Sequence, residues 1–201
     1  MLRKFGPFAL TGMLALPVAA EDRLNLGYNA VEAAVTSNED VRTRLLTNAD
    51  LNLGQVQIGY HALNEMNNFN GDTYFGRNAF TAGEKSKPVK FVSVVKTNGK
   101  GIIDAKAGLR VAKMPGGYGY VDLTFDTNST NMTLFYGRPF GKNSFELVQT
   151  AEFGTEKPSY YTEPQVNFSL GKHLAVFGRA EIPGFRLDNA KYLAGIAVVF
   201  R

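Results

Sequence analysis

Apolar and polar residues alternate along most of this 201-residue chain, and this period of two constrains its fold more than any other feature. In the clearest segment, Ile103–Val111, five apolar residues alternate with three charged residues and a glycine. Because successive side chains of a β-strand point to opposite faces, such a segment predicts a strand with one apolar face and one charged face.

Seven strands of this kind are predicted between Gly101 and Arg201. Turn signals separate them, among them Asn98-Gly99 just before the first strand, Pro115-Gly116-Gly117 and Gly141-Lys142-Asn143. Short turns between neighbouring strands predict an antiparallel meander. Pro164 opposes this for its own strand, because a central strand loses a ladder hydrogen bond at proline unless a bulge accommodates it.

The first half of the chain alternates less regularly. Strands are predicted at 24–30, at 51–62 with a bulge at Gly54, at 72–81 and at 89–96. The segment 37–47 is open to two interpretations. Ser37 and Asp40 could cap a short helix, or Val41, Thr43 and Leu45 could form one face of a further strand.

The N-terminus predicts export. Arg3 and Lys4 precede an apolar run from Phe5 to Leu16, and small residues follow up to Ala20. This pattern is typical of a signal peptide cleaved after Ala20, since the run is shorter than the ~20 residues of a spanning helix. Residues 21–201 then form one domain, without cysteine and therefore without disulfides.

The last strand carries the most specific signal. Tyr192, Ala194, Ile196, Val198 and Phe200 form an apolar face that ends on an aromatic residue. This resembles the C-terminal signature of Gram-negative outer-membrane β-barrel proteins, from which Arg201 departs by following the aromatic residue. The resemblance implies a bacterial outer-membrane location, contact with membrane lipid and recognition of Tyr192–Phe200 by the barrel-assembly machinery.

We therefore predict an all-β fold, an antiparallel up-and-down transmembrane β-barrel. Bacterial single-chain barrels have an even number of strands. Twelve strands result if 41–47 is a strand. Ten result if 41–47 is helical and 72–81 is a loop.

In such a barrel the apolar faces meet lipid and the polar faces line a lumen. The residues expected to line the pore are the basic Arg42, Arg44, Lys90, Lys96, Lys106, Arg110 and Arg179, the acidic Asp122, Asp126, Glu146, Glu152, Glu163 and Glu181, and the aromatic Tyr118, Tyr120 and Tyr161. Asp104 has the same parity. Most bases precede most acids in the chain, which predicts a basic wall opposite an acidic wall.

These features predict a porin-like channel that passively admits small polar solutes. One alternative is a plugged structural or adhesive barrel that binds partners through its loops. Another is a soluble periplasmic β-protein that binds lipid, with its apolar faces turned inward.

Other classes of function are disfavoured. Cleavage removes Arg3 and Lys4 and lowers the net charge from +4 to +2, too little to predict nucleic-acid binding. Two histidines and no cysteine predict no metal site, and no cofactor motif is present. His173 could approach Ser169, but no third catalytic partner or nucleophile elbow accompanies them, so we expect no enzyme.

Overall fold

The computed structural model describes residues 23–27, 29–68, 70–112 and 114–200. The predicted signal peptide, residues 1–20, lies outside the described residues.

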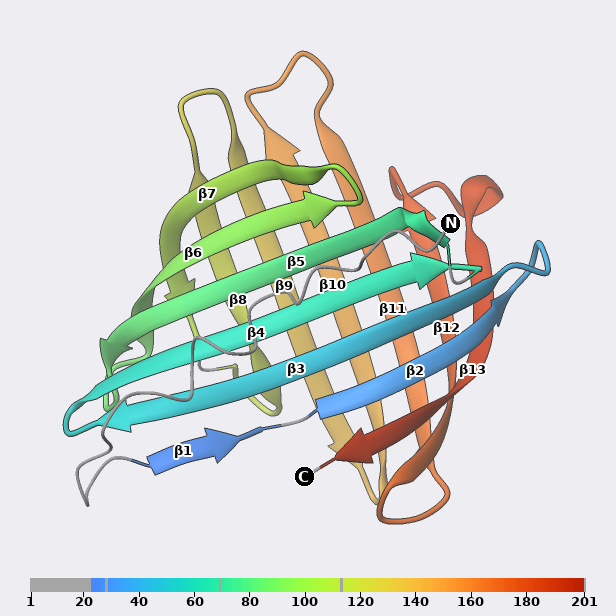
Figure 1. Ribbon diagram of the computed structural model, residues 1–201, viewed down its shortest axis with the longest axis horizontal. Coiled ribbons are helices and arrows are strands. Elements are labelled where there is room, and N and C mark those ends of the chain that lie inside the picture. Colours follow the sequence, from blue (N-terminus) through green and yellow to red (C-terminus); the bar gives the residue numbers. More distant parts are fainter. Residues whose placement is uncertain (1–22, 28, 69, 113, 201) are drawn as a thin grey trace, which may run out of the picture.

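The described chain consists of antiparallel strands and one short 3-10 helix, η1 (Leu187–Asn189) (Figure 1). The strands are β1 (Arg23–Leu26), β2 (Asn29–Thr36), β3 (Val41–Leu53), β4 (Val56–Asn67), β5 (Asn70–Glu84), β6 (Val89–Asn98), β7 (Gly101–Val111), β8 (Tyr118–Phe125), β9 (Thr130–Phe140), β10 (Asn143–Phe153), β11 (Ser159–Ser169), β12 (Leu174–Pro183) and β13 (Lys191–Phe200).

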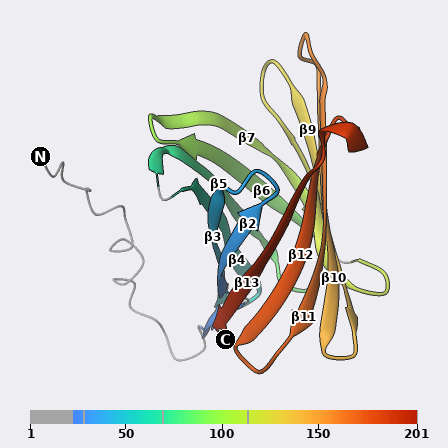
Figure 2. The same cartoon turned by 90° about the vertical axis from the view of Figure 1, so that its right-hand side faces the viewer.

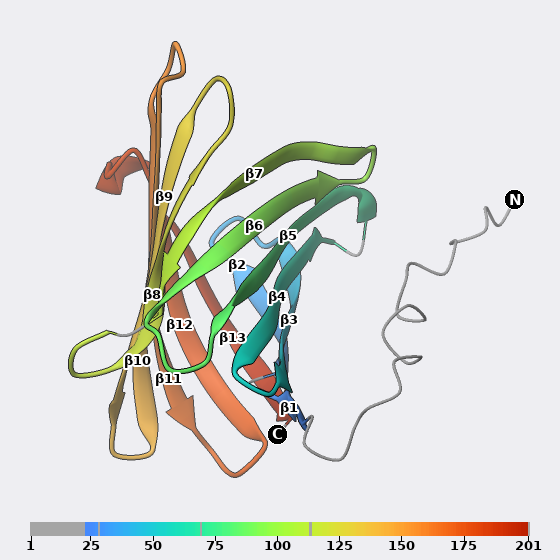
Figure 3. The same cartoon turned by 90° about the vertical axis from the view of Figure 1, so that its left-hand side faces the viewer.

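Each strand from β2 to β13 pairs with its sequence neighbour, and β13 pairs with β2 to close the sheet. β1 and β2 pair with successive parts of β3, so together they occupy one strand position. The result is a closed barrel of twelve strands, which confirms the predicted fold and count. The side views show β3 to β7 along one side and β9 to β12 along the other (Figures 2 and 3).

The structure resolves the open segment at 37–47. Residues 41–47 belong to the long strand β3, because cross-strand pairing with β2 and β4 outweighs the local helix-capping signal. The predicted bulge at Gly54 is wrong. Gly54 has a φ of 57° and forms the two-residue turn between β3 and β4.

Pro164 lies inside β11 without a register shift. It pairs with Leu147 of β10 on one side. On the other side, the ladder to β12 runs to Thr162↔Ile182 and resumes at Gln165↔Arg179, so proline sits where that ladder is interrupted. The missing N–H group is therefore accommodated by a gap in pairing and not by a bulge.

The burial of side chains is inverted relative to a water-soluble barrel. On β7, Leu109 is 53% exposed and its neighbour Arg110 is 2% exposed. The same alternation runs through β8, where apolar side chains face outward and polar ones face inward. β13 alternates in burial as well, although its buried residues, Leu193, Ala197 and Val199, are apolar. This confirms the predicted orientation of the two faces.

Among the described residues, no helix is long and apolar enough to cross a membrane.

Candidate functional site

The barrel interior contains a cavity of about 1090 Å³. We call the barrel end that carries the turns 54–55, 85–88, 112–117, 141–142 and 170–173 the terminal end, because β2 starts and β13 finishes there. The opposite end is the distal end. The cavity lining includes turn residues of the terminal end, such as Lys142 and Lys172, so we call this cavity the vestibule.

The distal half of the interior is occupied by buried ion pairs, which we call the septum. Its central residue is Arg44, 6% exposed, which reaches Glu163 at 2.6 Å and Glu181 at 3.1 Å and also contacts Glu65. Arg42 binds Glu65 and Glu181 as well. Arg179 reaches Glu163 as well, at 3.3 Å, so each carboxylate in this group is shared between arginines.

Small residues on two strands make these contacts possible. Arg44 on β3 meets Glu163 on β11 although β2, β13 and β12 lie between them in the sheet. β2 and β13 present Ala34, Gly195 and Ala197 to the interior, and the two alanines are buried. These small residues leave room for the long arginine side chains, although the two alanines also pack with the bulkier Leu193 and Phe177 in one buried cluster.

A second ion-pair group joins β5, β7 and β8. Arg110 donates two hydrogen bonds to Asp122, at 2.6 and 2.8 Å, and its guanidinium lies 3.7 Å from the ring centroid of Tyr120. Arg77 also reaches Asp122, at 3.1 Å. Two guanidinium groups therefore share one carboxylate, and this group carries an excess positive charge.

A third group closes the distal end near β7 and β10. Lys106, 5% exposed, contacts Glu152 at 2.5 Å and lies 3.7 Å from Asp126. Lys96 and Asp104 pair beside it at 3.1 Å.

The structure brings the predicted charged residues together on the inner side of the wall. Eight of the sixteen predicted pore-lining residues line the vestibule: Arg44, Lys90, Arg110, Tyr118, Tyr120, Glu146, Glu163 and Arg179. The expectation that the two charge types are held apart across water does not describe the septum, where they form direct ion pairs. Long side chains crossing the narrow barrel close that gap.

Sequence reasoning missed Glu32, Asp50, Glu65 and Arg77, all of which belong to the interior. They lie in β2 to β5, where the apolar alternation is interrupted by alanine, asparagine and threonine. For Glu32, its position between the apolar Val31 and Ala33 is a local sequence signal that would have predicted an inward side chain. With these carboxylates included, the first half of the chain is not a purely basic wall.

Aromatic side chains form a row on one wall of the vestibule. Ring centroids lie 6.0 Å apart for Tyr118 and Phe135, 5.6 Å for Phe135 and Tyr120, and 6.2 Å for Tyr120 and His61. The predicted aromatic Tyr161 lies elsewhere, because its hydroxyl donates to Glu163 at 2.5 Å within the septum.

The outer face carries aromatic residues at two levels. On β10, β11 and β13 the outward pairs are Phe145 and Phe153, Tyr160 and Phe168, and Tyr192 and Phe200. Each pair is eight residues apart, about 26 Å along a strand. A tilt of 35–45° reduces this to about 20 Å of height, close to the ~25 Å apolar band of membrane barrels.

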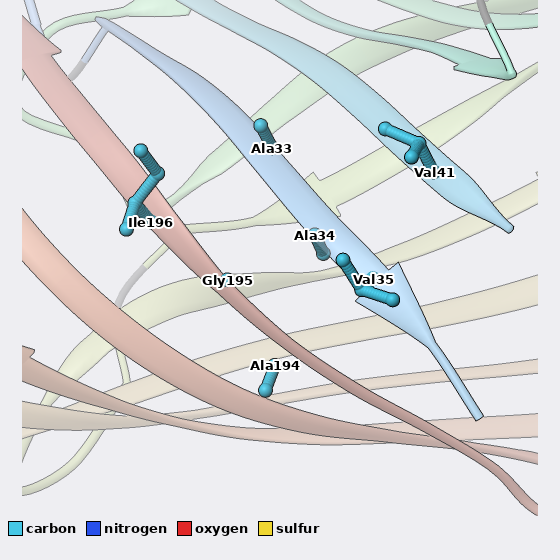
Figure 4. A pocket seen from close by; sticks show the side chains of 7 residues that line it. All are labelled: Ala33, Ala34, Val35, Val41, Ala194, Gly195 and Ile196. Carbon is cyan, nitrogen blue, oxygen red and sulfur yellow. The ribbon is translucent and has the colours of Figure 1, made fainter. Parts of the chain in front are cut away.

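A small hollow interrupts this outer face between β13 and β3. Its volume is about 250 Å³, and its walls are Ala33, Ala34, Val35, Val41, Ala194, Gly195 and Ile196 (Figure 4). All seven lining residues are apolar, so the hollow continues the apolar surface.

Ser169 and His173 are not paired with each other. The Ser169 hydroxyl donates to the Gly171 carbonyl at 2.8 Å, and His173 Nδ1 donates to the Val199 carbonyl at 3.0 Å. Within the described part of the chain, no three His, Cys, Asp or Glu side chains are grouped so as to hold a metal ion.

No protein-family model matches this sequence, and no curated protein matches it. Among solved structures, a mutant of the Rhodopseudomonas blastica porin is 9% identical with a TM-score of 0.45, covering 89% of this chain and 100% of that chain. A structure titled as de novo design of transmembrane β-barrels is 10% identical with a TM-score of 0.30, covering 88% and 94%. A structure titled as asymmetric conductivity of engineered proteins is 8% identical with a TM-score of 0.37, covering 90% and 100%.

Proposed function

We propose that this protein is a porin-like channel of the bacterial outer membrane that admits small polar solutes. The observation that carries the proposal is the inverted burial of a closed barrel. Most buried side chains are polar or charged, beside alanines and a few larger apolar residues such as Phe177 and Leu193, while large apolar side chains are exposed on the outside. A closed barrel satisfies every strand edge, which is the condition for β-structure to cross lipid.

The outer surface supports the membrane part of the proposal. Ile196 lies midway between Tyr192 and Phe200 and is 51% exposed. Large apolar side chains are exposed on most other strands as well. Aromatic residues at both levels of this surface suit the two interfaces of a bilayer. A signal peptide at residues 1–20 and recognition of Tyr192–Phe200 by the barrel-assembly machinery belong to the same proposal.

The interior supports the channel part. The vestibule gives solutes a water-accessible entrance lined by charged and hydroxyl groups. The septum then forms the narrowest part of the path, and ion pairs that exchange partners with water set its conductance.

Planar-bilayer recording tests the channel. The purified full chain should produce discrete conductance steps after insertion. A gel that compares boiled and unboiled samples establishes independently that the inserted protein is folded, because folded barrels migrate differently. Folded protein that gives no steps over many insertions would falsify the channel.

A second function, a plugged structural barrel, is favoured by the septum itself. Small barrels can be filled by their own side chains, and Arg42, Arg44, Lys106, Glu163 and Glu181 are each at most 8% exposed. This version predicts a folded, outer-membrane protein that remains silent in the bilayer.

A soluble lipid-binding protein is the remaining alternative. Such a protein would bury apolar side chains around its ligand, whereas the vestibule here has eleven charged side chains in its lining beside apolar ones such as Leu46, Leu63 and Val148. Recovery from the periplasmic fraction without detergent would support that alternative against ours.

A further inference from the structure

We propose that the vestibule is an anion-selective binding site, which takes small organic anions that carry a flat ring and enter from the terminal end. The inference rests on the proposed channel for its physiological meaning, but the site itself can be tested without conduction. Three observations carry it: the charges of the terminal end, the uncompensated charges of the lining, and the aromatic row.

The two ends of the barrel differ in charge. The described residues of the five terminal-end turns include four lysines, Lys85, Lys87, Lys142 and Lys172, and no carboxylate. All four lysines are exposed. Glu84, at the end of β5, is the neighbouring acid, and it accepts a hydrogen bond from Ser86.

The distal end has the opposite balance. Its described turns carry five carboxylates and three basic side chains. A solute that approaches the barrel therefore meets a positive rim at one end only. Low-dielectric walls concentrate such a field and raise the local concentration of oppositely charged solutes.

The vestibule lining retains this sign. Seven basic and four acidic side chains line it, and three further carboxylates just behind the lining, Asp122, Glu65 and Glu181, pair with the lining arginines Arg77, Arg110 and Arg44. Among the described residues, Lys90, Lys142 and Lys172 are in no ion pair, and the acids in no ion pair are Asp50 and Glu146.

The excess charge lies inside the cavity as well as at its mouth. Lys90 donates to the neutral amide of Gln57, and Arg77 shares the Asp122 carboxylate with Arg110. Cationic donors that lack a full carboxylate partner are suited to a carboxylate or phosphate of a ligand, because charge-assisted hydrogen bonds are the stronger ones.

The aromatic row adds the second element of recognition. Tyr118, Phe135, Tyr120 and His61 all line the vestibule, and Arg110 is stacked on Tyr120 at the inner part of the row. A planar ring can pack against this wall while its anionic group faces Lys90 and Arg77. Benzoate is the simplest probe with both features.

The first test measures ion selectivity of the full chain in a planar bilayer under a KCl gradient. We expect chloride to be more permeant than potassium, and the triple variant Lys90→Gln, Lys142→Gln, Lys172→Gln to lower the permeability ratio on the order of threefold. The matched control, Lys100→Gln with Lys157→Gln at the distal end, should leave the ratio unchanged. Cation selectivity, or equal effects of both sets, would overturn the inference and leave the channel standing.

The second test needs no conduction. Equilibrium dialysis of the detergent-folded protein should show benzoate binding that Lys90→Gln weakens on the order of tenfold. Benzyl alcohol, which lacks the charge, and acetate, which lacks the ring, should bind more weakly. Binding without any conductance would remove the proposed function and keep the site. Absent benzoate binding, or binding that Lys90→Gln leaves unchanged in a folded variant, would overturn the site.

Discussion

The distal and terminal halves of the lumen contain the same types of charged residue but hold them in opposite ways. In the distal half, Arg44 shares three carboxylates with its neighbours and is almost completely buried. In the terminal half, Lys90 faces the 1090 Å³ vestibule and has an amide as its partner. Arg110, the cross-strand partner of Lys90, is also buried and paired with Asp122, so the terminal half combines one buried ion-pair group with an open vestibule, whereas the distal half is filled by ion pairs.

This difference indicates that small residues, and not the charges alone, determine which half of the lumen is occupied by ion-paired side chains. Arg42 and Arg44 reach β11 and β12 because Ala34, Gly195 and Ala197 leave room above β2 and β13. In the terminal half, the bulky Tyr118, Tyr120 and Phe135 line the wall, and Lys90 is bonded to the amide of Gln57 and is in no ion pair among the described residues. Substitutions at four places in the barrel can break or sharpen this contrast.

Removing one charge from each half of the lumen should give the largest difference in the free energy of unfolding. Arg44→Met leaves Glu65, Glu163 and Glu181 buried with too few partners and should lower the free energy of unfolding by about 3–5 kcal/mol. Lys90→Met, in the vestibule, should cost less than about 1 kcal/mol. Urea unfolding in lipid vesicles measures both. Equal losses would mean that the septum is not the tighter half.

A lysine placed on the outer face tests whether both halves lie in one membrane band. Ile196→Lys should destabilise the barrel by about 2–4 kcal/mol, because it brings a charge to the middle of the band. Leu170→Lys, in an exposed turn beyond Phe168, should cost about 0–1 kcal/mol. The same urea titration distinguishes them. A small effect at Ile196 would contradict a lipid-facing surface.

A substitution at Gly195 adds one methyl group to the small residues of β13 beneath the septum. A Cβ on Gly195 would overlap the Ala33 carbonyl oxygen, so Gly195→Ala should cost about 1–3 kcal/mol through overpacking. Gly178 on the adjacent strand has nothing within 4 Å of its ideal Cβ and supplies the control. Gly178→Ala should be neutral or slightly stabilising. Comparable losses for the two variants would argue against a close approach of β13 and β2.

The smallest effect on stability is expected from Asp126, in a distal-end turn beside the septum. Backbone N–H groups of Asn128 and Ser129 donate to Asp126 and hold the pKa of its carboxyl below the ordinary value of 3.8. Because the folded-state pKa is lowered, the contribution of Asp126 is complete above pH 3.8 and is lost as pH falls through the folded-state pKa.

Asp126→Asn should therefore unfold at slightly lower urea than the parent chain at pH 7. The difference in the urea concentration at which the two chains unfold should become smaller as the pH falls below 3.8. A gap that is independent of pH would assign the effect to the amide side chain instead of the lost charge.

The barrel class could be predicted from sequence because it depends on a local property. Alternation such as Ile103–Val111 assigns each side chain to a face, and the two faces then require lipid or apolar packing on one side and water or ion pairs on the other. Residues 41–47 show the limit of local signals. The local sequence is equally compatible with a helix capped by Ser37 and Asp40 and with a strand, and only pairing with β2 and β4 selects the strand.

The sequence by itself determined which side chains share a face along the regular strands, because strand parity is a property of consecutive residues. In the irregular strands β2 to β5 it did not identify Glu32, Asp50, Glu65 and Arg77 as interior residues. Only the tertiary structure decided which of them meet. Arg44 and Glu163 are 119 residues apart, and their contact at 2.6 Å depends on barrel closure, on strand register and on the small residues between them. Closure converts a list of inward charges into a packed septum and an open vestibule, and no period in the sequence encodes that division.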